Sequence, residues 1–104
     1  MKRFIQKAEL KPEKLEEYKK LHAKVWPDVL KTISECNLSN YTISVIGTTA
    51  ISYFEYNGDN YDADIAKMEN DPVTQRWWKY TKPCFKGHED GVYYVDCEEI
   101  FHFQ

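Results

Sequence analysis

Two side chains that could carry acid–base chemistry lie four residues apart, at Tyr18 and His22. Residues at this spacing stack on one face of a helix, so a phenol and an imidazole would share a surface. Both lie on the apolar face of the helix predicted around them, which turns them toward the interior. Histidine suits proton transfer because its unperturbed pKa is near 6.5. A purely structural role would give the same pattern, with Tyr18 buried in the core beside a buried histidine whose ring nitrogens are hydrogen-bonded.

Trp26 lies one further turn along the same helix and is followed by Pro27. A proline inside a helix removes one hydrogen bond and crowds the preceding turn, so we expect a kink or a break after Trp26. The series Tyr-x-x-x-His-x-x-x-Trp-Pro gives this helix face aromatic side chains that carry polar atoms. A helix that only packs on a core usually has Leu, Ile and Val at these positions. The residues by themselves favour a functional role and a structural role about equally.

A second aromatic cluster lies in Gln75–Tyr80, where three aromatic rings and two cations occur within six residues. Neighbours on a helix point about 100° apart, so Trp77 and Trp78 cannot both face one core. One of them should face a pocket or an interface, and an aromatic ring can stack on the apolar face of a sugar. One core tryptophan and one interface tryptophan would also fit. Tyr41 is the first residue of a predicted strand, and its position alone does not indicate a functional role.

The other reactive residues give no recognised catalytic pattern. His88 falls in a charged loop and His102 between two phenylalanines, and the three histidines lack a metal-ligand spacing. Glu98 and Glu99 would point to opposite faces of a strand. The chain has no glycine-rich phosphate loop and no nucleophile signature. An enzyme of this sequence would therefore act on a small molecule by acid–base chemistry, without a metal or a cofactor.

The pattern of apolar residues predicts the elements that position these side chains. We expect strands over Arg3–Leu10, Tyr41–Ile46, Ala50–Tyr56 and Val92–Phe103, helices from Lys11 to Trp26, Pro27 to about Cys36, Tyr61 to Asn70 and Val73 to Tyr80, and a turn over Asn37–Asn40. This order is β-α-β-β-α-β, the ferredoxin-like α+β arrangement. It predicts a four-stranded antiparallel sheet with the helices on one face, and a second copy covering the other face in a two-fold homodimer.

Length and composition limit the class of protein. The 104 residues predict a single domain over 1–104, and the net charge of −3 without a basic stripe argues against nucleic acid as a partner. No apolar run approaches the roughly 20 residues that span a membrane. The three cysteines are widely spaced, which argues against disulfides or a zinc site and suggests a cytoplasmic protein.

Over essentially its whole length, the chain resembles the L-rhamnose mutarotase family. The resemblance rests on the motifs above, on Asn40-Tyr41 and on the closing Glu99-Ile100-Phe101. It implies a dimeric α/β barrel and an aldose mutarotase that interconverts the α and β anomers of a 6-deoxy sugar. L-rhamnose is the first candidate, with L-fucose or a related sugar as the alternative. In that family the histidine matching His22 is the proton donor, and the residues matching Tyr18, Tyr41, Trp77 and Trp78 contact the sugar.

The mechanism expected from the resemblance is ring opening and reclosure with His22 as the acid. Tyr18, Tyr41 or a water would then handle the anomeric hydroxyl. We expect His22→Ala to keep the fold and lose catalysis, and Trp77→Ala mainly to weaken binding. Two alternatives stay open, because fold alone does not define function. They are a cofactor-free monooxygenase of the dimeric α/β barrel type and a non-catalytic sugar-binding module.

Overall fold

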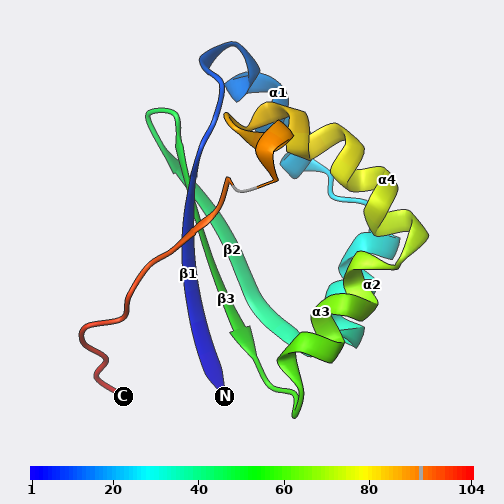
Figure 1. Ribbon diagram of the computed structural model, residues 1–104, viewed down its shortest axis with the longest axis vertical. Helices are drawn as coiled ribbons and strands as arrows, with labels where there is room; N and C mark the ends of the chain where they lie inside the picture. Colours follow the sequence, from blue (N-terminus) through cyan, green and yellow to red (C-terminus); the bar gives the residue numbers. More distant parts are fainter. Residues whose placement is uncertain (92) are drawn as a thin grey trace.

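The strands and helices follow the predicted β-α-β-β-α-β order, and each of the two helical connections consists of two helices, as the sequence predicted. The computed structural model describes residues 1–91 and 93–104 (Figure 1). The strands are β1 (Lys2–Glu9), β2 (Leu38–Ile46), β3 (Thr49–Tyr56) and β4 (Val95–Asp96), and the helices are α1 (Leu15–Ala23), α2 (Pro27–Glu35), α3 (Tyr61–Glu69) and α4 (Pro72–Thr81). Short 3₁₀ turns span Pro12–Lys14, Lys82–Cys84 and His88–Asp90. The α+β ferredoxin-like class is confirmed.

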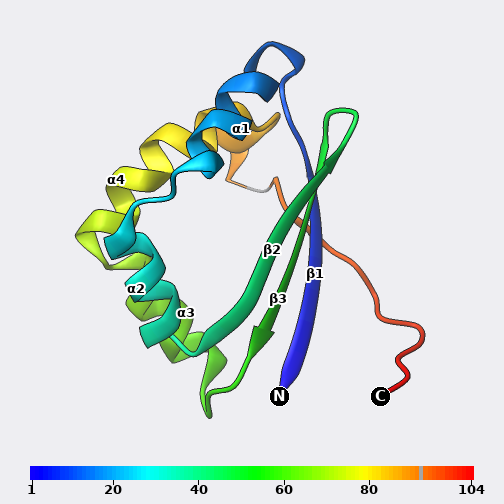
Figure 2. The same ribbon diagram turned by 180° about the vertical axis from the view of Figure 1, so that it is seen from behind.

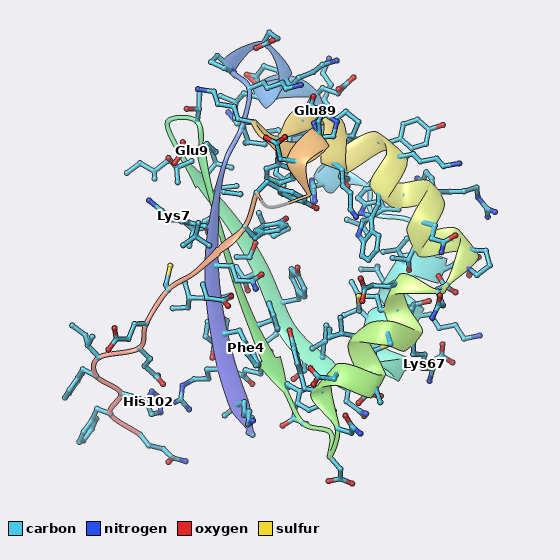
Figure 3. All side chains as sticks on the ribbon, in the orientation of Figure 1. Phe4, Lys7, Glu9, Lys67, Glu89 and His102 are labelled. Atoms are coloured by element: carbon cyan, nitrogen blue, oxygen red, sulfur yellow. The ribbon has the colours of Figure 1, made fainter. Side chains whose placement is uncertain are left out.

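The sheet is antiparallel, with strand order β2-β3-β1-β4. All four α-helices lie on one side of it, and no helix covers its other side in the described residues (Figures 1 and 2). Side chains alternate along β1, so Gln6 and Ala8 face the helices while Lys7 and Glu9 point away from them (Figure 3). The sheet therefore has one covered face and one open face.

The helix boundaries follow the local sequence. Pro27 is the first residue of α2, where its missing N–H costs nothing, and this confirms the break before Pro27. The break begins earlier than predicted, because α1 ends at Ala23 and Trp26 is the extended N-cap residue of α2. The Asn60 side chain accepts a hydrogen bond from the Ala63 N–H at the start of α3. Asp71 does the same at the start of α4, accepting from the Thr74 N–H at 2.8 Å. These caps satisfy N–H groups that have no partner within the helix.

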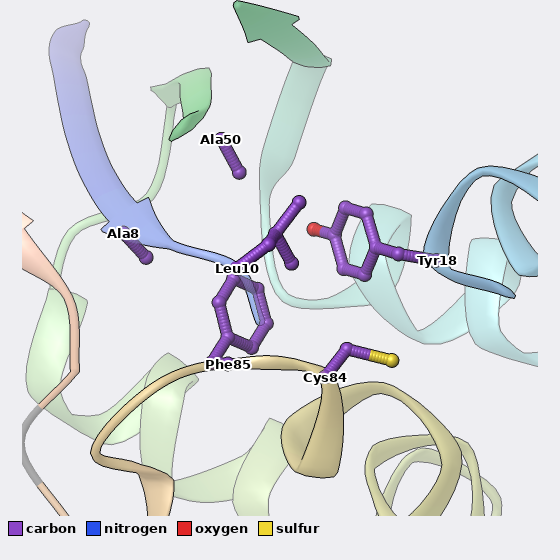
Figure 4. Packing of buried hydrophobic residues seen from close by; sticks show 6 residues of the cluster. All are labelled: Ala8, Leu10, Tyr18, Ala50, Cys84 and Phe85. Atoms are coloured by element: carbon purple, nitrogen blue, oxygen red, sulfur yellow. The ribbon is translucent and has the colours of Figure 1, made fainter. Parts of the chain in front are cut away.

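Two clusters of buried residues join the helices to the sheet. The first connects β1, α1 and the segment after α4, and Figure 4 shows Tyr18 reaching from α1 toward Leu10 and the sheet. Its members are Ala8, Leu10, Tyr18, Ala50, Cys84 and Phe85. The second lies toward the other end of the sheet and comprises Cys36, Leu38, Phe54, Tyr56 and Met68. The two clusters hold the helical layer to the sheet at both ends.

Two predicted boundaries were wrong. Asn37–Asn40 is not a four-residue turn, because Leu38 is buried and already belongs to β2. The turn comprises Cys36 and Asn37, the latter with φ 66°, and Asn40, with φ 50°, lies in an irregularity between Ser39 and Thr42. Asparagine tolerates this left-handed conformation better than most residues.

The predicted strand Val92–Phe103 is also much shorter than expected, and Val92 lies outside the described residues. β4 covers only Val95–Asp96, after which the Cys97 N–H still donates to the carbonyl oxygen of Ile5. After β4 the chain moves away from β1, and residues 97–104 form no strand with the rest of the described protomer (Figure 1). An alternating pattern predicts a capacity for pairing, and the pairing itself needs a neighbouring strand.

Within residues 1–91 and 93–104, no helix has the length and apolar character needed to cross a membrane. All three cysteines are free, with Cys36 and Cys84 buried and Cys97 exposed. Location in the cytoplasm stays a prediction.

Candidate active site

A cavity of about 530 Å³ lies between the helical layer and the covered face of the sheet. This volume is within the usual range for small-molecule sites. Its lining is mostly aromatic and aliphatic, with a few polar groups that include Gln6, Tyr18, His22, Tyr41, Lys82 and Tyr94. An apolar wall with a few hydroxyl, amide and imidazole groups suits a ligand that has both an apolar face and hydrogen-bonding oxygens.

His22 and Tyr18 lie together in this cavity, as their spacing on α1 predicted. Their ring centroids are 4.3 Å apart. The Nδ1 atom of His22 lies 2.8 Å from the backbone carbonyl oxygen of Tyr18. A carbonyl oxygen can only accept, so Nδ1 carries a hydrogen and proton exchange at this imidazole must use Nε2. The site therefore holds a histidine with one nitrogen fixed by the helix backbone.

The adjacent tryptophans have different environments, although both line the cavity. Trp77 is buried, with 6 % of its surface exposed, and its ring lies 5.6 Å from His22 and 5.2 Å from Trp26. Trp78 is half-buried, and the Lys82 ammonium lies 4.3 Å from its ring centroid. Trp77 thus packs against the ring of His22, while Trp78 is the more accessible aromatic side chain.

Tyr41 enters the cavity from β2, where its ring stacks on that of Phe54 at 5.1 Å. The residue is 40 % exposed. Burial of its hydroxyl, with smaller contributions from Tyr61 and Tyr93, nevertheless raises the pKa of Tyr41 to about 12. The hydroxyl is therefore protonated at neutral pH and available as a hydrogen-bonding group.

All five predicted site residues, Tyr18, His22, Tyr41, Trp77 and Trp78, line this one cavity. Their individual roles stay predictions. A histidine in a charged loop is expected to be solvated, and for His88 this expectation was wrong, because its side chain is only 24 % exposed and its Nδ1 lies 3.3 Å from the Phe85 carbonyl oxygen. His102 lies in the exposed C-terminal segment, 4.0 Å from Glu99. Neither of these histidines lines the main cavity.

Several cavity residues were not predicted. Gln6 donates to the Asp96 carboxylate at 2.8 Å, and its sequence signal was a polar residue among the apolar residues of β1 that face the helices. Lys82 reaches the cavity from the 3₁₀ turn after α4. Tyr93 and Tyr94 both line the cavity because the chain is not yet a strand there. Strict alternation would have placed one of the two on the open face.

Among the described residues, no group of three or more His, Cys, Asp or Glu side chains is arranged to hold a metal ion. The buried thiol of Cys84 lies 3.6 Å from the Glu17 carboxylate. Burial, together with this carboxylate, raises the pKa of the Cys84 thiol to about 11, so the sulfur is protonated and a poor nucleophile at neutral pH. The side chains that line the cavity offer the imidazole of His22, several hydroxyl groups, the carboxylate of Glu69 and the ammonium of Lys82.

These features define a ferredoxin-like α+β domain with an aromatic small-molecule site. The family model described as L-rhamnose mutarotase matches residues 3–103. The chain therefore belongs to the L-rhamnose mutarotase family, whose members are isomerases.

Curated relatives agree with this assignment, and two solved structures share the fold. The chain is 31 % identical over 94 residues to the L-rhamnose mutarotase of Listeria monocytogenes, covering 89 % of each chain. It is 30 % identical over 92 residues to that of Oceanobacillus iheyensis, covering 88 % of each. The crystal structure of an L-rhamnose mutarotase from Formosa agariphila has the same fold, with a TM-score of 0.81, 20 % identity and full coverage of both chains. Tetracenomycin F2 cyclase from Streptomyces glaucescens shares the fold at a TM-score of 0.71 and 10 % identity, covering 100 % of this chain and 98 % of the cyclase chain.

Proposed function

We propose that this protein is an L-rhamnose mutarotase that interconverts the α and β anomers of the sugar, with His22 as the proton-transfer residue. The observation that carries the proposal is the orientation of His22. Its Nδ1 atom is held by the Tyr18 carbonyl oxygen, which leaves Nε2 to exchange a proton in a cavity of small-molecule size. Membership of the L-rhamnose mutarotase family supports this sugar as the first choice.

In the proposed reaction, the bond between the anomeric carbon and the ring oxygen breaks. The imidazolium of His22 gives its Nε2 proton to the ring oxygen, while the anomeric hydroxyl loses its proton and becomes an aldehyde oxygen. The Tyr41 hydroxyl, which lines the same cavity, or a water would receive and relay that second proton. Rotation about the adjacent carbon–carbon bond, followed by the reverse proton transfers, closes the ring as either anomer. A positioned acid–base group typically contributes about 10² to 10⁴ in rate, which suits a reaction that already proceeds in water.

The sugar would lie against the aromatic walls of the cavity. The more accessible ring of Trp78 suits packing against the apolar face that bears the methyl group of a 6-deoxy sugar. Gln6 and Lys82 bring an amide and an ammonium group to the same cavity as hydrogen-bonding groups for the hydroxyls. A cavity that offers both aromatic surface and a few hydrogen-bonding groups would suit a deoxy sugar, which has one apolar methyl group among its hydroxyls.

The test is saturation-transfer NMR on the anomeric protons of L-rhamnose, with and without the protein, followed by L-fucose and by unrelated aldoses. We expect faster exchange for L-rhamnose than for the other sugars. Exchange at the buffer rate for every sugar, from a folded protein, would refute the mutarotase proposal and favour a binding module. Oxygen consumption with an aromatic substrate would instead indicate a monooxygenase.

A homodimer is part of the proposal, because the open face of the sheet carries exposed apolar residues. Strand register places Ile5, Ile46, Ile51 and Val95 on this face. The C-terminal segment adds Ile100, Phe101 and Phe103, which are 89 %, 80 % and 86 % exposed. Contiguous apolar surface of this kind marks an interaction site in a protein of this size. A second copy of the chain, related by a two-fold axis, would cover it.

A further inference from the structure

Polar side chains cross the covered face of the sheet beside the cavity. Strand register places Ile43, Ser52, Gln6 and Asp96 opposite one another across β2, β3, β1 and β4. Residues opposite one another in neighbouring strands point to the same face of the sheet. Ile43 and Gln6 both line the cavity, so this row lies on its sheet side. Three of the four residues are polar, although most of the cavity lining is aromatic or aliphatic.

Ser52 shows that packing alone does not explain this row. It is only 1 % exposed, and its hydroxyl has no hydrogen-bond partner among the residues that the structure describes. A buried hydroxyl without a partner lowers stability, so an apolar side chain would serve a purely structural floor better. Polar groups on the sheet side of the cavity suit a ligand that carries hydroxyl groups.

The neighbouring residue in the row, Gln6, has its amide oriented by Asp96. The Gln6 Nε2 atom lies 2.8 Å from the Asp96 Oδ1 atom. An ionised carboxylate can only accept, so the amide must turn its NH₂ group toward Asp96, and Oε1 points away from it. Asp96 lies on the edge strand β4 and does not line the cavity, whereas Gln6 does. The Oε1 atom is therefore on the side of the amide that faces the cavity.

We propose that Gln6 determines specificity by accepting a hydrogen bond from one sugar hydroxyl through Oε1, and that Asp96 is a positioning residue that holds the amide in this orientation. The inference rests on the proposed mutarotase function for the identity of the ligand. In that reaction His22 acts at the ring oxygen and the anomeric centre, so the hydroxyl that Gln6 accepts from is one of those at C2, C3 and C4. A sugar without this hydroxyl would leave the Gln6 oxygen unpaired and would bind more weakly.

The oriented amide can be observed without catalysis, by NMR of the side-chain amide groups in ¹⁵N-labelled protein. The Gln6 resonances would be assigned from their loss in Gln6→Met. We expect Asp96→Ala to shift them, while those of Gln75 stay in place, because its Nε2 donates to the backbone carbonyl oxygen of Glu69 at 2.8 Å. Glu98→Ala removes another exposed carboxylate, two residues further along, and should shift neither. Unchanged Gln6 resonances in Asp96→Ala, or equal shifts in Glu98→Ala, would overturn the proposed pair.

Kinetics test whether the pair acts on the sugar. We expect Gln6→Met to raise KM for L-rhamnose about three- to tenfold, the effect of one hydrogen bond, with kcat nearly unchanged. Asp96→Ala should raise KM by a similar factor and should have no further effect in the Gln6→Met background. Glu98→Ala should keep the wild-type KM. Equal effects of Asp96→Ala in both backgrounds would show that it does not act through Gln6 and would overturn the inference.

Sugar analogues identify the hydroxyl. Among the three analogues of L-rhamnose that lack the hydroxyl at C2, C3 or C4, we expect one against which Gln6→Met no longer discriminates. Wild-type discrimination against all three in Gln6→Met would overturn the inference. A wild-type protein inactive on every sugar would refute the proposed function. The Gln6 amide resonances would then still decide the inference, because a shift on adding L-rhamnose would show the contact and no shift would exclude it.

Discussion

His22 Nδ1 lies 2.8 Å from the backbone carbonyl oxygen of Tyr18, one turn earlier on α1. This contact fixes both the orientation of the ring and the nitrogen that carries the hydrogen, because a carbonyl oxygen cannot donate. Trp77 packs edge-on against the other side of the imidazole at 5.6 Å. The helix backbone and a buried tryptophan thus hold the imidazole in place before any ligand binds. A fixed orientation of this kind favours a catalytic role for His22 over a role in ligand binding alone.

The first prediction concerns catalysis by this imidazole. Removing it in His22→Ala should lower anomer exchange about 10²- to 10⁴-fold, to near the buffer rate, because the positioned acid is lost. Saturation-transfer NMR measures the rate, and circular dichroism should show the wild-type fold. His88→Ala is the matched control, because His88 lies outside the main cavity. Wild-type exchange in folded His22→Ala would remove His22 from the mechanism.

The second prediction separates the two tryptophans. Trp77→Ala should destabilise the protein by about 3 to 5 kcal/mol, because Trp77 is buried in contact with Trp26 and His22 and its loss leaves a cavity. The sequence suggested mainly a loss of binding, and the burial of Trp77 adds this larger effect on stability. Trp78→Ala should instead raise KM for the sugar with a smaller change in stability. Urea unfolding and Michaelis–Menten kinetics on both variants decide this, and equal effects of the two changes on unfolding would contradict it.

Local spacing was sufficient for the fold class and for the pair Tyr18 and His22 in the cavity, while Tyr41 was predicted only through the family resemblance. Tyr18 and His22 share a helix face through a four-residue step, and Pro27 marks the break between α1 and α2 in any context. Residues that reach the cavity through long-range packing were not predictable in this way. Tyr94 faces the cavity because of where the chain returns after α4, and no local pattern encodes that path. The length of β4 depends likewise on a neighbouring strand.

The third prediction concerns the cap of α4. Asp71→Ala should lower the thermal midpoint by roughly 3 to 8 °C, because the carboxylate accepts from both the backbone N–H and the hydroxyl of the buried Thr74, each at 2.8 Å. These bonds lower the pKa of Asp71 in the folded state. Its contribution is therefore present above the unfolded pKa, near 3.9, and is lost as pH falls through the folded pKa.

The control for this prediction is Asp71→Asn, because the amide side chain keeps an acceptor oxygen at the cap but cannot titrate. This variant should resemble the wild type at pH 7 and should lose less stability than the wild type between about pH 5 and pH 2. Thermal unfolding at several pH values measures both effects. An acid response of Asp71→Asn identical to that of the wild type would show that Asp71 does not contribute to the pH dependence.

The fourth prediction concerns alkaline pH. The pKa of Tyr41 is raised to about 12 by burial, against about 10 in the unfolded chain. The unfolded state therefore loses its proton first, and the stability that Tyr41 contributes is present below pH 10 and lost as pH rises toward 12. Urea midpoints should fall from pH 9 to pH 11, less steeply in Tyr41→Phe than in the wild type. Tyr80→Phe, on an exposed residue, is the control, and a slope unchanged in Tyr41→Phe would contradict the assignment.

The fifth prediction tests the open face of the sheet. Ile51 lies on this face, in the central strand β3, and Phe101 lies in the exposed C-terminal segment. A carboxylate at each position would have to be desolvated at an apolar interface, so the double variant Ile51→Asp/Phe101→Asp should shift a dimer to a monomer. Sedimentation velocity measures the mass directly.

Tyr80→Asp is the matched control for this prediction, because it places the same charge on an exposed aromatic residue of α4, on the helical side of the molecule. This control should keep the wild-type mass. The two variants also bear on the site, since the cavity lies on the other side of the sheet from Ile51. A monomeric double variant that retains mutarotation would show that each protomer holds a complete site. A dimeric double variant would instead place the interface elsewhere on the surface.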